Sequence, residues 1–398
     1  MPIPYPRPSI NTSSIVKVKA LVAATLLSGI FGQAGAINLD AEGTLTASGF
    51  YSLTAAKILD GATQGAGPSW NYAQWRCPCF VANWATATVY EKDKALSFDE
   101  SVAGLQISKE FTPQLSFTTQ IVTRSRDARS AQTAVDWAYG TWQSTDTYTK
   151  LRAGRMRVPL YYYSDYLYVG YAYPWVRAPA ESYITEIEDY DGINLSHAMR
   201  LADSDWMLTG QIWYGRRNDQ DNPLYSRIIQ LAPTDVTWSR INGISASVNN
   251  GIADLRMVLM TTRKSMAQTN PDGTTTSIGG DVPIRLTGVS GNIHYHGWIA
   301  RSEFNRGESD DPRDSYRYLL IGGGYRFHTL TTMLTHSRYR RYGEPVEERG
   351  TTAITMRWDF TKDTALKLQY DVTRDRSLYV APFFGESRLL SLSLQGVF

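Results

Sequence analysis

The sequence has little of what metal sites, nucleic-acid-binding surfaces and helical membrane proteins need. Only two of its 398 residues are cysteine and five are histidine, and after the N-terminal segment no run of 18 apolar residues occurs. A helix that spans a bilayer needs about 20 such residues. The 40 basic residues barely exceed the 38 acidic ones, whereas binding nucleic acid requires a basic surface. We therefore expect neither a helical membrane protein nor a nucleic-acid-binding protein.

The residues of a hydrolase are also not evident. Serine hydrolysis needs a serine and a histidine with a third group that orients the histidine, and the sequence contains no Gly-x-Ser-x-Gly segment. His294 and His296 fall on one face of a strand by their spacing, but no third metal ligand is evident beside them. We expect no catalytic activity, no bound metal and no other cofactor.

The two cysteines, Cys77 and Cys79, flank Pro78. An oxidising compartment would permit a disulfide, but a bridge across one residue closes a cramped ring. A metal site would need histidines or clustered carboxylates nearby, and none follows. We interpret the pair as a loop feature without chemistry and leave its pairing open.

What the sequence does contain begins with a targeting signal. Lys17 and Lys19 precede an apolar run over residues 20–31, and the small-x-small segment that ends at Ala36 follows. A basic region, a short apolar region and such a segment in this order are typical of a secretory signal peptide. We expect residues 1–36 to be removed, which leaves one domain over residues 37–398.

The remaining chain alternates apolar and polar side chains along short segments. A strand that spans a membrane needs about 9 to 11 residues of this pattern, and 25 tyrosines and 11 tryptophans suit two membrane interfaces. The turn Asn249-Asn250-Gly251 is a strong hairpin signal. The predicted strands lie at or near residues 43–53, 103–107, 115–121, 135–139, 151–153, 193–199, 208–214, 244–248, 255–259, 289–295, 298–304, 319–325, 332–334, 352–360, 366–372 and 390–398.

These 16 segments are joined alternately by short turns and longer connections. Backbone groups in hydrocarbon are satisfied only in helices and closed barrels, and bacterial barrels have an even number of strands. The predicted fold class is therefore all-β, a transmembrane antiparallel barrel of about 16 strands. A soluble all-β protein is the alternative, but it does not explain the asymmetry of the connections.

The C-terminal segment carries a resemblance to a known family. Its alternating apolar residues and terminal aromatic resemble the assembly signal of Gram-negative outer-membrane proteins, and residues 151–159 loosely resemble the porin strand before the inward-folded third loop. The chain thus resembles 16-stranded porins over nearly its whole mature length. This resemblance implies an outer-membrane location, a surrounding lipid bilayer, a homotrimer, recognition by the barrel-assembly machinery and an inward-folded third loop. The residues of the assembly signal are Leu390, Leu392, Leu394 and Phe398.

The third long connection, residues 158–190, is where a pore would narrow. It is rich in tyrosine and, together with the adjoining Asp191, has Asp165 and five further carboxylates between residues 181 and 191, against one arginine. Carboxylates on a loop inside the lumen would face arginines on the wall and create a transverse field. Strict alternation puts Arg152 in the lumen, while Arg155 and Arg157 join it only if the strand ends or bulges at Gly154. The predicted constriction is Arg152, Arg155, Arg157, Arg177, Glu181, Glu186, Glu188, Asp189 and Asp191, and the predicted lumen wall is Lys150, Arg124, Arg200 and Arg256.

The function expected from this arrangement is passive diffusion of ions and small hydrophilic solutes through a water-filled pore. A substrate-specific channel for sugars, aromatic acids or anions is the alternative, with the tyrosines as a stacking surface. An outer-membrane hydrolase is a second and weaker alternative. The charges nearly cancel, so the sequence leaves the ion preference open.

Overall fold

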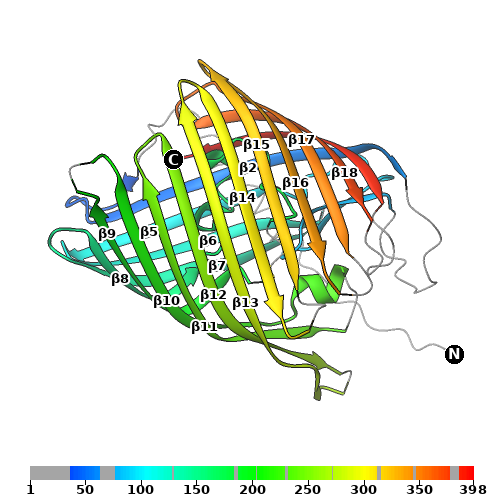
Figure 1. The fold of residues 1–398 in the computed structure, drawn as a ribbon, viewed down its shortest axis with the longest axis horizontal. Helices are drawn as coiled ribbons and strands as arrows, with labels where there is room; N and C mark the ends of the chain where they lie inside the picture. The colour runs from blue at the N-terminus through cyan, green and yellow to red at the C-terminus, as the bar shows by residue number, and fades with distance from the viewer. Residues whose placement is uncertain are drawn as a thin grey trace.

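The structure is a computed structural model of the chain, seen as a ribbon in Figure 1. It describes residues 36–62, 77–127, 130–182, 187–202, 204–228, 232–270, 272–311, 315–343, 347–376 and 385–398. The expected signal peptide therefore lies outside the described residues, apart from its last position.

The described residues form sixteen long strands in one closed sheet. Each strand pairs antiparallel with the next along the chain, and the last, β19, pairs with the first, β2, so no edge is left open. In Figure 1 the blue β2 and the red C-terminal strand meet at this seam. The strands are β2 (Leu45–Ala62), β5 (Val102–Thr112), β6 (Leu115–Asp127), β7 (Ser130–Gln143), β8 (Thr149–Arg157), β9 (Asp189–Arg200), β10 (Met207–Asp219), β11 (Thr234–Asn249), β12 (Ala253–Thr269), β13 (Thr275–Tyr295), β14 (Trp298–Ser309), β15 (Tyr316–Phe327), β16 (Leu330–Arg341), β17 (Glu348–Asp359), β18 (Thr364–Asp375) and β19 (Glu386–Val397).

The prediction of a closed antiparallel barrel of 16 strands is confirmed. The strands are longer than predicted, chiefly toward the end of the barrel that carries the long connections. One expected long connection almost disappears for this reason, because β6 ends at Asp127 and β7 begins at Ser130. The barrel thus has a short-turn end, as at the β5–β6 turn, and a long-connection end, at which β2 and β8 end and their long connections begin.

The alternation of side chains makes the two faces of the sheet chemically different. Along β17, Ile354 and Trp358 are exposed on the outer face, while Thr351 and Thr355 are buried on the inner face. The other strands follow the same rule, so the outer face is mainly apolar and the inner face largely polar. This is the distribution that a barrel surrounded by lipid requires.

Smaller elements that were not predicted lie at the long-connection end. A hairpin of β3 (Cys79–Asn83) and β4 (Thr88–Glu91) belongs to the first long connection, and Cys77 and Cys79 at its base form a disulfide. A π-helix, η4 (Leu224–Ile228), lies between β10 and β11, and the two-residue β1 (Ile37–Asn38) pairs with β2. No helix in the described ranges is both long and apolar enough to cross a membrane.

The C-terminal residue completes the seam of the barrel. The backbone N–H of Gly49 on β2 donates to the carbonyl of Phe398 at 2.8 Å, and Phe398 N–H donates to Gly49 at 2.9 Å. The Phe398 ring covers Gly49 so closely that a Cβ there would lie 2.3 Å from Cζ of the ring and 2.8 Å from the Gly104 carbonyl oxygen. Closure of the barrel therefore depends on a glycine at this position.

We predict that Gly49→Ala destabilises the closed barrel by about 1–3 kcal/mol, the usual cost of overpacking a tight contact. Gly210→Ala on β10 is the matched control, because nothing lies within 4 Å of a Cβ at Gly210. After refolding in detergent, the fraction that migrates in the compact form on unheated gels and the thermal unfolding midpoint should both fall for Gly49→Ala only. Equal values for the two variants would contradict the role assigned to the Phe398 contact.

Candidate pore constriction

The described residues of the connection between β8 and β9, 158–182 and 187–188, are here called the inner loop. They fold into the barrel and reach the wall opposite β8. The inner loop leaves β8, and the indole N–H of Trp175 donates to Thr335 on β16 at 2.8 Å. In a closed sheet of sixteen strands, β16 is eight strands away from β8 and therefore directly opposite it. Near the start of the inner loop, Arg256 on β12 donates to the carbonyls of Pro159 and Tyr161 at 2.5 and 2.9 Å.

A buried lysine fixes the middle of the inner loop. Lys367 on β18 has 0% exposure, and its Nζ donates to the carbonyls of Gly170, Tyr173 and Trp175 at 2.7, 2.6 and 2.9 Å. The Gly170 carbonyl also accepts the Tyr173 N–H at 3.4 Å, at the end of the 3₁₀ helix η3 (Gly170–Ala172), whereas Tyr173 and Trp175 lie beyond this helix. The ammonium group therefore substitutes for the backbone partners that a helix or strand would supply.

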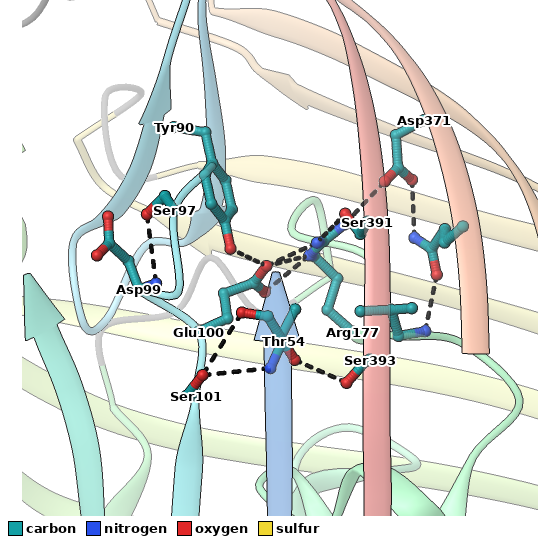
Figure 2. A network of polar contacts seen from close by, with 12 residues as sticks. Thr54, Tyr90, Ser97, Asp99, Glu100, Ser101, Arg177, Asp371, Ser391 and Ser393 are labelled. Carbon is teal, nitrogen blue, oxygen red and sulfur yellow. Dashed lines mark hydrogen bonds and ion pairs between the residues drawn. The ribbon is translucent and has the colours of Figure 1, made fainter. Parts of the chain in front are cut away.

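Two residues after Trp175, Arg177 of the inner loop joins the first long connection to strands β18 and β19 (Figure 2). Its guanidinium pairs with Glu100 at 2.6 Å and with Asp371 on β18 at 2.8 Å, and it donates to Ser391 on β19 at 2.6 Å. The Tyr90 hydroxyl of the hairpin donates to the same Glu100 carboxylate at 2.7 Å. Burial opposes the charge, but Glu100 and Asp371 hold the pKa of Arg177 above its ordinary value. Arg177 thus ties the inner loop and the first long connection to the wall.

Glu181 holds the following segment of the inner loop. Its carboxylate is 1% exposed and accepts hydrogen bonds from Ser337 and Thr351 at 2.7 and 2.6 Å, with Arg349 at 3.4 Å. A buried carboxylate with this set of donors stabilises one position of the loop rather than facing a solute.

Most aromatic side chains of the inner loop pack against the wall. Tyr163, Tyr173 and Trp175 contact one another with ring centroids 5.4 to 6.2 Å apart, and they cover Tyr318 and Met333 of the wall. Edge-on contacts between rings of this kind stiffen a loop. These tyrosines therefore belong to the architecture of the loop.

A second ionic network lies where the inner loop leaves and rejoins the wall. Arg157 pairs with Asp136 at 2.7 Å and with Glu188 at 3.5 Å, and Arg124 pairs with Asp136 at 3.0 Å. The Tyr168 hydroxyl donates to Glu188 at 2.6 Å. Although burial would raise it, the pKa of Glu188 lies below its ordinary value because Arg157 and Arg124 favour the carboxylate. Asp136 reaches this network because it is the unpaired residue at a register shift between β6 and β7.

The water-facing side of the inner loop is formed by Asp165 and Tyr166, both exposed. Asp165 lies within electrostatic reach of the hydroxyls of Tyr139 on β7 and Tyr190 on β9, and so does Arg152 on β8. The Arg152 guanidinium lies 5.6 Å from the centroid of the Tyr139 ring. A loop carboxylate and a wall arginine therefore lie near the same two tyrosines, and this part of the lumen is the candidate constriction.

The predicted constriction residues occupy several different places. Four of them are held in the networks above: Arg157, Arg177, Glu181 and Glu188. Asp189, the first residue of β9, pairs with Arg217 on β10 at 2.8 Å. Arg155 and Asp191 were expected in the lumen but lie in register on β8 and β9 with their side chains on the outer face. They form an ion pair there at 2.9 Å, and their side chains are 34% and 47% exposed. They lie on the outer face because β8 continues past Gly154 as a regular strand. Glu186 lies outside the described residues.

The predicted wall residues lie on the inner face and divide into two groups. Arg124 and Arg256 bind the networks and the inner loop as described. Lys150 and Arg200 form no ion pair among the described residues, and neither does Arg152. Asp165 was not among the predicted constriction residues, since nothing in its sequence neighbourhood distinguishes a water-facing carboxylate from an anchoring one.

A cleft remains between the hairpin, the inner loop and the wall. It encloses about 750 Å³, part of it open to solvent. The hairpin contributes Asn83 and Thr88, and the wall contributes Thr54 and Arg124. Polar and apolar groups both line this cleft.

Apolar side chains cover part of the long-connection end. Trp84 of the hairpin belongs to one buried cluster with Ile187 of the inner loop and with Leu224, Tyr225 and Ile228 of η4. The Arg349 guanidinium stacks 4.2 Å from the centroid of the Trp84 ring. The hairpin and η4 therefore lie inside the mouth of the barrel rather than above it.

No group of three histidine, cysteine or carboxylate side chains suited to a metal occurs in the described part of the chain. His294 contacts Arg301, and His296 lies in the β13–β14 turn with φ of 47°. The two histidines therefore do not share a strand face.

The sequence matches no model of a protein family and no curated protein. Solved structures of the same shape exist at low identity. OmpT of Vibrio cholerae is 11% identical, with a TM-score of 0.55 over 92% of this chain and 100% of that one. The outer-membrane channel DcaP of Acinetobacter baumannii is 9% identical, with a TM-score of 0.55 over 89% and 97%. An anion-selective porin from Comamonas acidovorans is 11% identical, with a TM-score of 0.53 over 89% and 99%. The likeness establishes a shared fold.

We predict that Lys367→Met loosens the inner loop and lowers the stability of the barrel. Each buried carbonyl left without its donor costs about 1–3 kcal/mol. Lys367 donates to three carbonyls, of which the Gly170 carbonyl keeps the Tyr173 N–H as a second donor. Lys57→Met is the matched control, because Lys57 is exposed on the outer face of β2. Denaturant unfolding in detergent should show a loss for Lys367→Met alone, and limited proteolysis should cut its inner loop faster. A variant as stable and as resistant as the control would refute the anchoring role.

Proposed function

We propose that this chain, which has the fold of Gram-negative outer-membrane porins, is an outer-membrane channel for passive diffusion of ions and small hydrophilic solutes. The observation that carries the proposal is the division of the lumen by the inner loop. The loop is bound to the wall formed by β12 and β14–β19, while Asp165 and Arg152 face water on the other side. Fixed charges across a narrow wet passage are the usual means by which a pore selects.

Diffusion through such a passage needs no cofactor, no energy source and no catalysis. Solutes would be excluded by size where Asp165 and Tyr166 approach the wall, and sorted there by charge. The proposed constriction keeps Arg152 and the inner loop from the sequence prediction and adds Asp165.

The partners follow from the same proposal. OmpT of Vibrio cholerae has been solved in a trimer form, and we propose a homotrimer surrounded by outer-membrane lipid. Leu390, Leu392 and Leu394 alternate on the outer face of β19, and Phe398 ends the chain. We propose that the barrel-assembly machinery recognises this terminus.

A substrate-specific channel is the second candidate, and one observation favours it. The hairpin and η4 place an apolar cluster in the mouth of the barrel, against which an apolar part of a solute could pack. A channel of this kind would bind its solute while conducting it.

The test is single-channel recording of the refolded protein in planar bilayers. The proposal predicts stepwise, long-lived conductance that rises with salt concentration and liposome swelling that falls with solute size. A protein that inserts but gives no conductance would contradict it. Conductance that saturates with, or is blocked by, one class of sugar or acid at up to millimolar concentration would replace the general pore by the specific channel.

A further inference from the structure

The charges inside the barrel fall into two classes. Toward the long-connection end they are buried and paired, as in the contacts of Arg157 with Asp136 and of Arg177 with Asp371. Paired buried charges hold structure together and present little net field to a passing ion. The ion preference therefore depends on the charges that face water without a partner.

Three such cations lie on one wall between the constriction and the short-turn end. Arg152 is level with Asn194, Lys150 is level with Ser196 one step farther along, and Arg200 ends β9. Leu151 lies between Lys150 and Arg152 on β8 and is level with Leu195 on β9, and both leucines are exposed on the outer face. Because side chains alternate along a strand, Lys150, Arg152 and Arg200 face the lumen. None of the three forms an ion pair with any residue that the structure describes.

The surroundings of these cations do not neutralise them. The inner-face residues level with them or beside them on the neighbouring strands are all uncharged: Thr141 and Gln143 on β7, Asn194 and Ser196 on β9, and Met207 and Gln211 on β10. Asp165 of the inner loop and Arg152 both lie within electrostatic reach of Tyr139 and Tyr190. Glu110 faces the lumen from β5, three strands from β8. The exposed Asp146 and Asp205 lie in the turns beyond the ends of these strands, so no carboxylate is level with the three cations on the neighbouring strands.

On the opposite wall the carboxylates have basic neighbours. Asp359 pairs with Arg357 at 2.7 Å and with Arg326 at 3.6 Å. Asp254 accepts a hydrogen bond from Asn249 at 2.9 Å and precedes Arg256 by two residues on the same face of β12. Arg301 faces the lumen from β14 as well. Along the strands, the inner-face positions between the inner loop and the short-turn end therefore carry more cations than carboxylates.

We propose that the channel prefers anions, that is, small inorganic anions and carboxylate solutes, and that Arg152, Lys150 and Arg200 form the series of cations that attracts them. This inference rests on the proposed pore. Narrow passages with low-dielectric walls concentrate counter-ions near fixed charges of one sign, and successive unpaired cations lower the energy of an anion at each step. Asp165 opposite Arg152 makes the field transverse at the entrance to this series.

The experiment measures reversal potentials under a KCl gradient in planar bilayers. The lumen variant carries Lys150→Gln, Arg152→Gln and Arg200→Gln. The control carries Arg285→Gln, Arg317→Gln and Arg340→Gln, which remove the same charge from outer-face positions on β13, β15 and β16. The wild-type protein and the control should show a chloride-to-potassium permeability ratio above unity. In the lumen variant the ratio should fall to unity or below.

A wild-type channel that prefers potassium, or a lumen variant that keeps the wild-type ratio, would overturn the inference and leave the pore intact. A wild-type protein that gives no conductance would instead remove the proposed function itself. If the triple variant does not refold, Lys150→Gln alone carries the test, because Lys150 has no ion-pair partner among the described residues and its loss leaves no carboxylate unpaired. The single variant should lower the permeability ratio in the same direction.

Discussion

Backbone N–H and C=O groups inside hydrocarbon have no water to bond, and every other feature of this molecule follows from how the chain satisfies them. Sixteen strands pair in sequence, and β19 returns to β2. Closure requires Phe398 to lie against Gly49, where no side chain fits. Once the sheet is closed, alternation assigns each side chain to lipid or to the interior. The interior is then wide enough to hold the inner loop.

The inner loop repeats the same requirement on a smaller scale. It has little regular structure, so its carbonyls and amides depend on side chains of the far wall. Lys367 serves three carbonyls, and Gln369 and Gln395 serve the amide and carbonyl of Val176. The charged side chains that hold the inner loop are buried and bound to carbonyls or to groups of opposite charge. The charged side chains that a solute would meet are the water-facing ones: Lys150 and Arg152 on β8, Arg200 on β9 and Asp165 on the inner loop.

The barrel could be predicted from the sequence because alternation is local: each segment of about ten residues reveals its own two faces. The hairpin Thr352 to Val372 is an example, and β17 and β18 confirm it. The charges of the candidate site could not be sorted in this way. Glu181 and Thr351 are 170 residues apart, and Arg177 and Asp371 are 194 apart. Whether a loop carboxylate anchors or faces water depends on such distant partners. The prediction that Arg155 and Asp191 face the lumen was wrong for a simpler reason. Strands β8 and β9 extend farther than their sequence patterns suggested, and regular alternation puts both side chains on the outer face.

The central claim is that the inner loop lies inside the barrel with Asp165 toward the water path and Val176 against the wall. Thiol accessibility during current recording tests it most directly, in a Cys77→Ser, Cys79→Ser background with Asp165→Cys or Val176→Cys added. A charged, membrane-impermeant thiol reagent should reduce the current through the Asp165→Cys channel and leave the Val176→Cys channel unchanged, because Val176 is 4% exposed. An unaffected Asp165→Cys channel, with a blocked Val176→Cys channel, would contradict the account.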